Sequence, residues 1–169
     1  MIFNGIKRRW MRKVIAEKQE QDRNPVIWPK SAVIICEHDQ LSAIETFYDW
    51  AHELKINKQN VTILCAVKDV KKDIVSEVVT FDRKLFKWSG GFNDLEVKNI
   101  LDQSFDLQLN YYRNSSEMLD FMASYMRSRI KVGCGNEEDS LNDLTIHIDP
   151  SDHKLFIKEL KKYLSILTQ

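Results

Sequence analysis

The amino-acid sequence predicts an α/β fold: a three-layer, doubly wound, mostly parallel sheet of six strands, Rossmann-like or flavodoxin-like, with an extra basic N-terminal helix. Two observations predict it. Short, nearly continuous apolar runs, typical of strands buried on both faces, alternate with amphipathic stretches of helical period. Residues 32–67 alone contain a strand, a helix and a strand, a unit whose crossover is expected to be right-handed. The expected strand order is 3-2-1-4-5-6, with the reversal between strands one and four.

Each expected element has its own pattern in the chain. Strands are expected over residues 32–36, 60–67, 78–81, 105–111, 130–132 and 144–148. Helices of the domain are expected over residues 41–55, 93–103, 114–128 and 150–169. Residues 85–88 are expected to form a short extended segment before a glycine turn.

Residues with capping chemistry precede the expected helices. Asp39 or Ser42 is the expected N-cap of the first of them, and Asn93 and Asn114 begin stretches with the spacing of a capping box. Asp149 comes before a proline at the first position of the last helix, which is the preferred place for proline.

The chain is divided into a basic amphipathic helix over residues 1–24, a linker over 25–30 and a single α/β domain over 31–169. Apolar residues of the first segment recur at steps of three and four, which predicts a helix over residues 2–23. Its other faces are basic, through Lys7, Arg8, Arg9, Arg12 and Lys13. Three interpretations stay open: the apolar stripe packs on the domain, the helix contacts an anionic membrane peripherally, or it binds a partner.

Composition limits the classes of function. Lys and Arg number 25, as do Asp and Glu, so no global field attracts nucleic acid. No apolar run approaches the roughly 20 residues that span a bilayer, and no secretory signal is recognised. Cys36 and Cys65 lie in apolar runs and are expected to be buried, whereas Cys134, between two glycines, is expected to be exposed. Three thiols without close pairs favour a reducing, cytoplasmic location over a disulfide framework or a zinc site.

Polar residues follow strands one and four, where the carboxyl ends of a doubly wound sheet bind ligands. The candidate ligand-binding residues are His38, Asp39, Arg113, Asn114 and Ser115. Free backbone N–H groups near Asn114, together with Arg113, suit a phosphorylated or sugar-like ligand. The alternatives are that Asn114 and Ser115 only cap a helix and that residues 37–40 form a solvated polar turn.

Several catalytic signatures are missing from the sequence. It contains no G-x-G-x-x-G, no Walker loop, no H-E-x-x-H and no G-x-S-x-G. The four histidines are scattered along the chain. We therefore expect no metal site and no cofactor, and we assign no catalytic residue.

Five pieces of the chain carry a resemblance that covers nearly its whole length. They are Gly5-Ile-Lys-Arg-Arg-Trp10, Phe105-Asp-Leu-Gln-Leu-Asn110, Ile130-Lys-Val-Gly133, Leu144-Thr-Ile-His-Ile-Asp149 and Lys162-Tyr-Leu-Ser-Ile166. In these pieces the chain resembles a family of small uncharacterised bacterial α/β proteins, a domain of unknown function. The resemblance implies the fold but no activity.

A second resemblance covers residues 105–133 only. A strand of type F-D-L, a helix and then Arg129-Ile-Lys-Val-Gly133 look like the N-terminal, acceptor-side half of heptosyltransferases. Those enzymes hold the sugar nucleotide on a second α/β domain, for which this chain has no room. The resemblance therefore implies shared topology, and fold does not imply function.

The leading hypothesis is a non-catalytic cytoplasmic protein that acts by binding or association through its basic N-terminal helix. Its partner and its oligomeric state are not predicted. The alternative is a protein that binds a small phosphorylated or sugar-like ligand, or an enzyme acting on one, in the crevice at the ends of strands one and four.

Overall fold

The sheet has six strands in the order β3-β2-β1-β4-β5-β6, and all neighbouring strands are parallel. The computed structural model describes residues 5–19, 25–70, 77–135 and 141–169. The strands are β1 Ala32–Glu37, β2 Val61–Ala66, β3 Val79–Phe81, β4 Ser104–Tyr111, β5 Arg127–Cys134 and β6 Leu144–Ile146. The predicted fold, strand order and reversal between β1 and β4 are confirmed.

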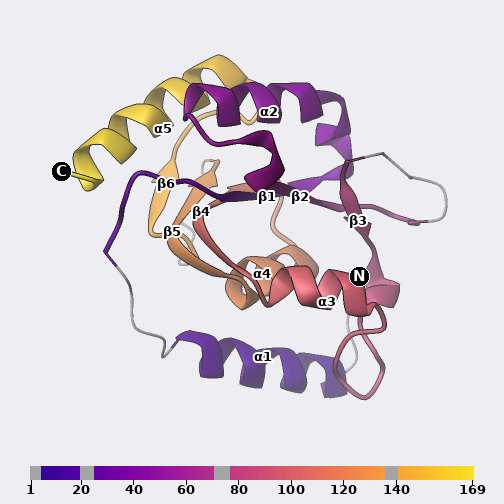
Figure 1. Cartoon of the computed structure of the whole chain (residues 1–169). Helices are drawn as coiled ribbons and strands as arrows, with labels where there is room; N and C mark the ends of the chain where they lie inside the picture. Colours follow the sequence, from indigo (N-terminus) through magenta and orange to yellow (C-terminus); the bar gives the residue numbers. More distant parts are fainter. Residues whose placement is uncertain (1–4, 20–24, 71–76, 136–140) are drawn as a thin grey trace.

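Helices cover both faces of this sheet (Figure 1). The α-helices are α1 Gly5–Gln19, α2 Ile44–Glu53, α3 Leu95–Leu101, α4 Glu117–Tyr125 and α5 His153–Leu167. In the view of Figure 1, α2 and α5 lie above the sheet, α3 and α4 lie below it, and α1 lies below α4. The apolar core accordingly forms two clusters: an upper cluster between the sheet, α2 and α5, and a lower cluster between the sheet, α1, α3 and α4.

The first strand is central because it is apolar on both faces. Its residues from Ala32 to Cys36 are all buried, and it pairs with β2 on one side and β4 on the other. Cys65 lies opposite Cys36 in this register and is also buried, as predicted for both thiols. The sheet therefore places the carboxyl ends of β1 and β4 side by side.

The basic N-terminal helix packs against the domain. Met11 of α1 is buried, while Trp10, Val14 and Ile15 are half-buried against the lower cluster. The Trp10 ring lies 5.2 Å from the ring of Phe121 in α4. Of the three interpretations, the first is therefore confirmed: the apolar stripe of this helix packs on the domain. The division at residues 24 and 30 stays a prediction.

Two expected N-caps are wrong by one or two positions. Asp94, rather than Asn93, caps α3 and accepts from the N–H groups of Glu96 and Val97. The Asn93 amide instead donates to the carbonyl of Lys84. Ser116, rather than Asn114, caps α4 by accepting from the Leu119 N–H.

The predicted start of the last helix is also wrong, because it lies three residues before the observed one. Asp152 rather than Asp149 caps α5, and its carboxylate accepts from the Leu155 N–H. Asp149 accepts from the Ser151 N–H and hydroxyl, and the Pro150 carbonyl accepts from Tyr111. These bonds hold residues 149–151 in a turn before the helix.

The remaining differences are local. Residues 38–43 form a 3₁₀ helix before α2, and neither Asp39 nor Ser42 caps α2 with its side chain. Residues 83–85 form a 3₁₀ turn, and only Phe86 of the expected extended segment pairs, with Phe92. Cys134 is buried rather than exposed because β5 extends to it and residues 146–148 cover it.

A chain of buried amides runs under β4 on the α4 side. Gln108 is 0% exposed and Asn110 is 2% exposed. The Gln108 amide donates to the Asn110 side chain at 2.9 Å and to the Ala123 carbonyl at 2.8 Å, while the Ser128 hydroxyl donates to Gln108. The Asn110 amide donates in turn to Asn142 at 2.6 Å. Hydrogen bonds therefore fix β4 to its neighbours on this side.

Candidate functional site

The two loops predicted to form a crevice meet at the carboxyl edge of the sheet. Cys36 and Tyr111 are partners in the β1–β4 register, so the residues after them are neighbours. The backbone N–H groups of Arg113 and Asn114 lie close enough to the Glu37 carboxylate to act against the rise in its pKa. The contact between the loops therefore runs through the side chain of Glu37, which was not among the predicted site residues.

The Glu37 carboxylate lies beside two N–H groups of the kind that an anionic ligand uses. Partial burial and the neighbouring charge of Asp39 raise the pKa of Glu37 above its ordinary value. The two N–H groups and the positive charge of Arg113 act in the opposite direction but do not cancel that shift. The carboxylate is thus a partly buried group that lies beside the N–H groups of this edge.

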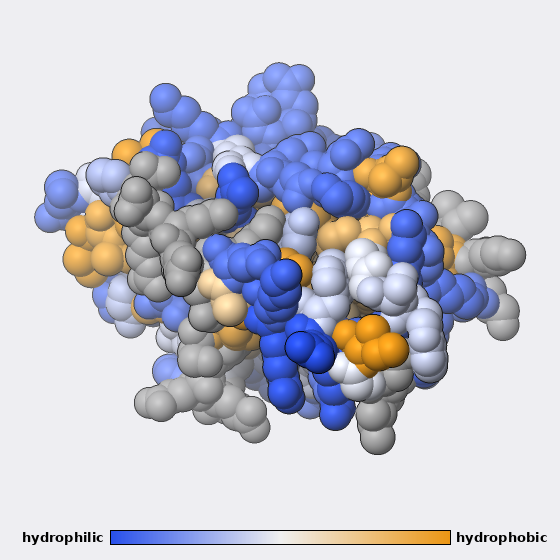
Figure 2. Space-filling view, turned by 90° about the horizontal axis from the view of Figure 1, so that it is seen from below, coloured by the Kyte–Doolittle hydropathy of each residue, from blue (hydrophilic) through white to orange (hydrophobic). Residues whose placement is uncertain are grey.

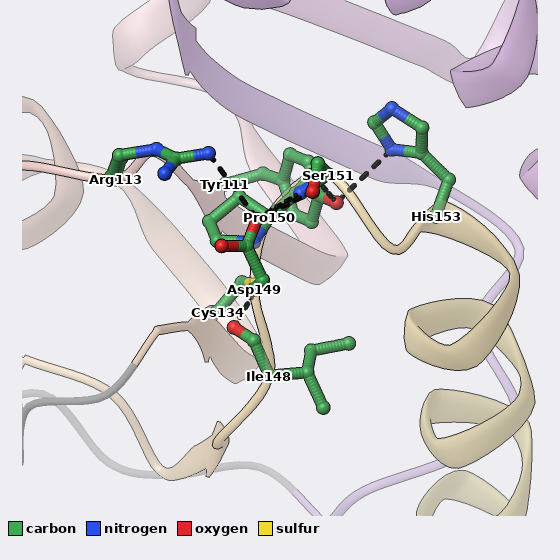
Figure 3. Close-up of polar contacts among 8 residues, drawn as sticks. All are labelled: Tyr111, Arg113, Cys134, Ile148, Asp149, Pro150, Ser151 and His153. Carbon is green, nitrogen blue, oxygen red and sulfur yellow. Dashed lines mark hydrogen bonds and ion pairs between the residues drawn. The ribbon is translucent and has the colours of Figure 1, made fainter.

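The predicted ligand-binding residues have different surroundings from those expected. His38, Asp39, Asn114 and Ser115 are all exposed. The Arg113 guanidinium forms an ion pair with Asp149 at 3.2 Å (Figure 3), and the Ser115 hydroxyl donates to Asp120. The sheet brings the two loops together beside Glu37, and Arg113 and Ser115 each pair with a residue outside the predicted set.

A second polar cluster lies beside the edge and joins Tyr111 to the start of α5 (Figure 3). The buried Tyr111 hydroxyl donates its one proton to the Pro150 carbonyl, which can only accept. His153 Nδ1 lies 3.1 Å from the same hydroxyl, so that nitrogen must carry a proton and donate. Burial raises the pKa of Tyr111, which keeps the phenol neutral. No sequence signal indicates this pair, because the two residues lie on different elements and 42 positions apart.

The Cys134 thiol is buried and hydrogen-bonded. Its thiol donates to the Ile148 carbonyl at 3.7 Å (Figure 3). Burial, with a smaller contribution from Asp149, raises the pKa of Cys134 to about 12. The thiolate is the nucleophilic form of cysteine, so this thiol is a poor nucleophile at neutral pH.

The basic residues predicted as a partner surface divide into two groups on α1. Arg8 forms an ion pair with Glu117 of α4, and Lys13 lies 3.8 Å from Glu17 on its own helix. Arg9 and Arg12 are exposed and form no ion pair within the part of the chain that the structure describes, and Lys7 is half-buried. Seen from below, the side of the molecule that carries α1 is strongly hydrophilic over wide areas (Figure 2).

Residues that bind metals do not cluster in the described ranges. Among them, no group of three or more His, Cys, Asp and Glu side chains is placed to hold a metal ion. Within the same ranges, no helix combines the length and the apolar character that crossing a membrane requires.

Comparisons with known proteins bear on the family alone. No curated protein gives a significant match. The fold is similar to the glycosyltransferase GlyE of Streptococcus pneumoniae TIGR4, with a TM-score of 0.41, 10% identity and coverage of 92% of this chain. This chain spans 37% of that structure's chain, and similarity at this level carries no argument about function. Residues 6–167 match the model of DUF6913, a family of unknown function, and the chain therefore belongs to that family.

Proposed function

We propose that this protein is a non-catalytic, cytoplasmic association protein that binds an acidic surface of a partner protein through the outer face of α1. One observation carries the proposal. Most of the apolar side of α1 packs on the domain, with Ile6 exposed, while Arg9 and Arg12 on its other side are exposed.

Because α1 packs on the domain, its exposed positive charges are held in fixed positions. Met11 is buried and Trp10 packs on Phe121, so α1 does not need to fold or turn when a partner arrives. Preorganisation of this kind lowers the entropic cost of binding. A guanidinium also forms paired hydrogen bonds with a carboxylate, which makes arginine suited to an acidic protein surface.

The two other hypotheses have less support. In the crevice, the negative charge of Glu37 lies beside the N–H groups that a phosphorylated or sugar-like ligand would use, and Arg113 is paired with Asp149. A membrane would have to be bound mainly by charge, because most of the apolar stripe of α1 faces the domain. Three free, buried thiols support the cytoplasmic location.

The test measures binding of poly-glutamate to the full chain by fluorescence anisotropy. We expect Arg9→Glu/Arg12→Glu to weaken binding about tenfold or more, because two charge contacts become repulsions. Wild-type binding should also weaken as salt rises.

The matched control is Lys154→Glu/Lys158→Glu, two exposed positions of α5 on the other side of the sheet. It changes the net charge by the same amount, so equal weakening by both double variants would contradict a site on α1. A further arm replaces poly-glutamate with vesicles of phosphatidylserine and phosphatidylcholine. Binding to the vesicles but not to poly-glutamate would indicate that α1 binds a membrane rather than a partner protein.

A further inference from the structure

Arg8 is the arginine of α1 that the proposed site does not use. It lies four residues before Arg12, and residues four apart on a helix are neighbours on one face. Its guanidinium forms an ion pair with the Glu117 carboxylate of α4, whereas Arg9 and Arg12 form no ion pair among the described residues. The basic face of α1 therefore contains a third arginine that an acid of the same chain already occupies.

The ion pair between Arg8 and Glu117 is only partly shielded from water. The two side chains are 41% and 37% exposed. Ion pairs between side chains this exposed contribute little to stability, so exchange of Glu117 for another carboxylate costs little. Glu117 also lies in the first turn of α4, where the helix dipole favours a negative charge without Arg8. Neither side chain therefore depends on the other for its place in the fold.

The Arg8 guanidinium is incompletely paired in this position. Its Nε is buried and has no hydrogen-bond partner in the part of the chain that the structure describes. A buried donor without an acceptor costs free energy. A guanidinium can donate two parallel hydrogen bonds to one carboxylate, so a partner's carboxylate can use a donor that Glu117 leaves unused. Transfer of Arg8 from Glu117 to an acidic partner is therefore favoured by the hydrogen bond it adds.

We infer that the ion pair between Arg8 and Glu117 is an autoinhibitory contact: Glu117 occupies Arg8, and an acidic partner must displace it to bind all three arginines of α1. The inference rests on the proposed function, because it concerns the regulation of the same site. Glu117 also lowers the affinity by repulsion, since its negative charge lies beside Arg8, one helical turn from Arg12. A neutral residue at position 117 should therefore strengthen binding to an acidic surface.

Binding of poly-glutamate to full-chain variants, again measured by fluorescence anisotropy, tests the inference. Glu117→Gln keeps the size of the side chain and removes its charge, so it should lower the dissociation constant about three- to fivefold, the effect of one exposed ion pair. Arg8→Gln added to Glu117→Gln should return the affinity to near the wild-type value, because the gain comes from the released guanidinium. Thermal unfolding of each variant checks that the chain is folded.

The matched control is Glu53→Gln on α2, on the other side of the sheet. Glu53 forms an ion pair with Lys161 at 3.2 Å, and these two side chains are exposed to a similar extent. The substitution therefore releases a cation and changes the net charge by the same amount as Glu117→Gln. It should change the affinity much less. Equal tightening by the two variants would show an effect of net charge alone and would overturn the inference.

A second control is Lys154→Gln added to Glu117→Gln, which removes one positive charge at an exposed position of α5 and should keep most of the gain. A gain that survives Arg8→Gln to the same extent would overturn the role of Arg8. If Arg9→Glu/Arg12→Glu weakens binding but Glu117→Gln does not strengthen it, this inference alone fails. If Arg9→Glu/Arg12→Glu leaves binding unchanged, the proposed function fails as well.

Discussion

The two sides of β4 are both buried, but they are built from opposite chemistry. Toward α2 and α5 the strand presents Leu107, Leu109 and Tyr111, which pack in the upper cluster. Toward α4 it presents Gln108 and Asn110, which are as deeply buried as the leucines. Apolar packing is not directional, whereas each hydrogen bond of the amide side specifies one partner. The comparison suggests that the upper side contributes mainly stability and the lower side mainly fixes β4 against α4, β5 and Asn142.

The largest effect is expected from breaking the amide chain at its centre. Gln108→Leu makes the lower side more apolar, yet it should destabilise the fold by about 3 kcal/mol, because Asn110 and Ser128 lose buried partners. Urea unfolding measures the change. The double variant Gln108→Leu/Asn110→Leu should cost less than the sum of the two single variants. Additive costs would show that the two amides do not act as one unit.

A smaller effect is expected where the amide chain leaves β4. A Cβ at Gly133 would come within 2.0 Å of the Asn142 amide nitrogen. Gly133→Ala should therefore displace Asn142 from Asn110 and destabilise the fold by about 2 kcal/mol. Gly5→Ala, which meets nothing within 4 Å, is the control and should leave the free energy of unfolding nearly unchanged. Equal values for the two variants would mean that Asn142 moves aside at little cost.

The smallest effect concerns Glu37 at the carboxyl edge of the sheet, and it is measured as a change in stability with pH. The pKa of Glu37 is raised in the folded state, so its contribution to stability is full below the unfolded pKa and is lost as pH rises through the folded pKa. Wild type should therefore lose stability relative to Glu37→Gln as pH rises above about 4.3. Thermal unfolding at several pH values measures the difference.

For Asp149, the expected change of stability with pH has the opposite sign. Hydrogen bonds from Ser151 lower the pKa of Asp149, so its contribution is present above the unfolded pKa and is lost as pH falls through the folded pKa. Wild type should lose stability relative to Asp149→Asn as pH falls below about 3.9. The same sign for both carboxylates would contradict the surroundings assigned to Glu37.

The elements of the sheet could be predicted because their signals are local. Five consecutive apolar residues from Ala32 indicate a central strand before any contact is known. The N-caps were less predictable, since Asn93 and Asp94 both have capping chemistry and a bond from Asn93 to the Lys84 carbonyl decides between them. In β4, apolar residues alternate with Asp106, Gln108 and Asn110, a pattern that is typical of a strand with one solvent-exposed side. Only the packing of α4 shows that this side is buried.

Apolar periodicity was enough to predict the fold class, and the order usual for a doubly wound sheet then predicted the strand order and the position of the carboxyl edge. Only the folded structure shows that Glu37 lies beside the N–H groups of Arg113 and Asn114, and that Tyr111 meets His153. It also decided which side of α1 remains open to a partner. These are contacts between residues far apart in sequence, and their partners are selected by packing, which no local pattern encodes.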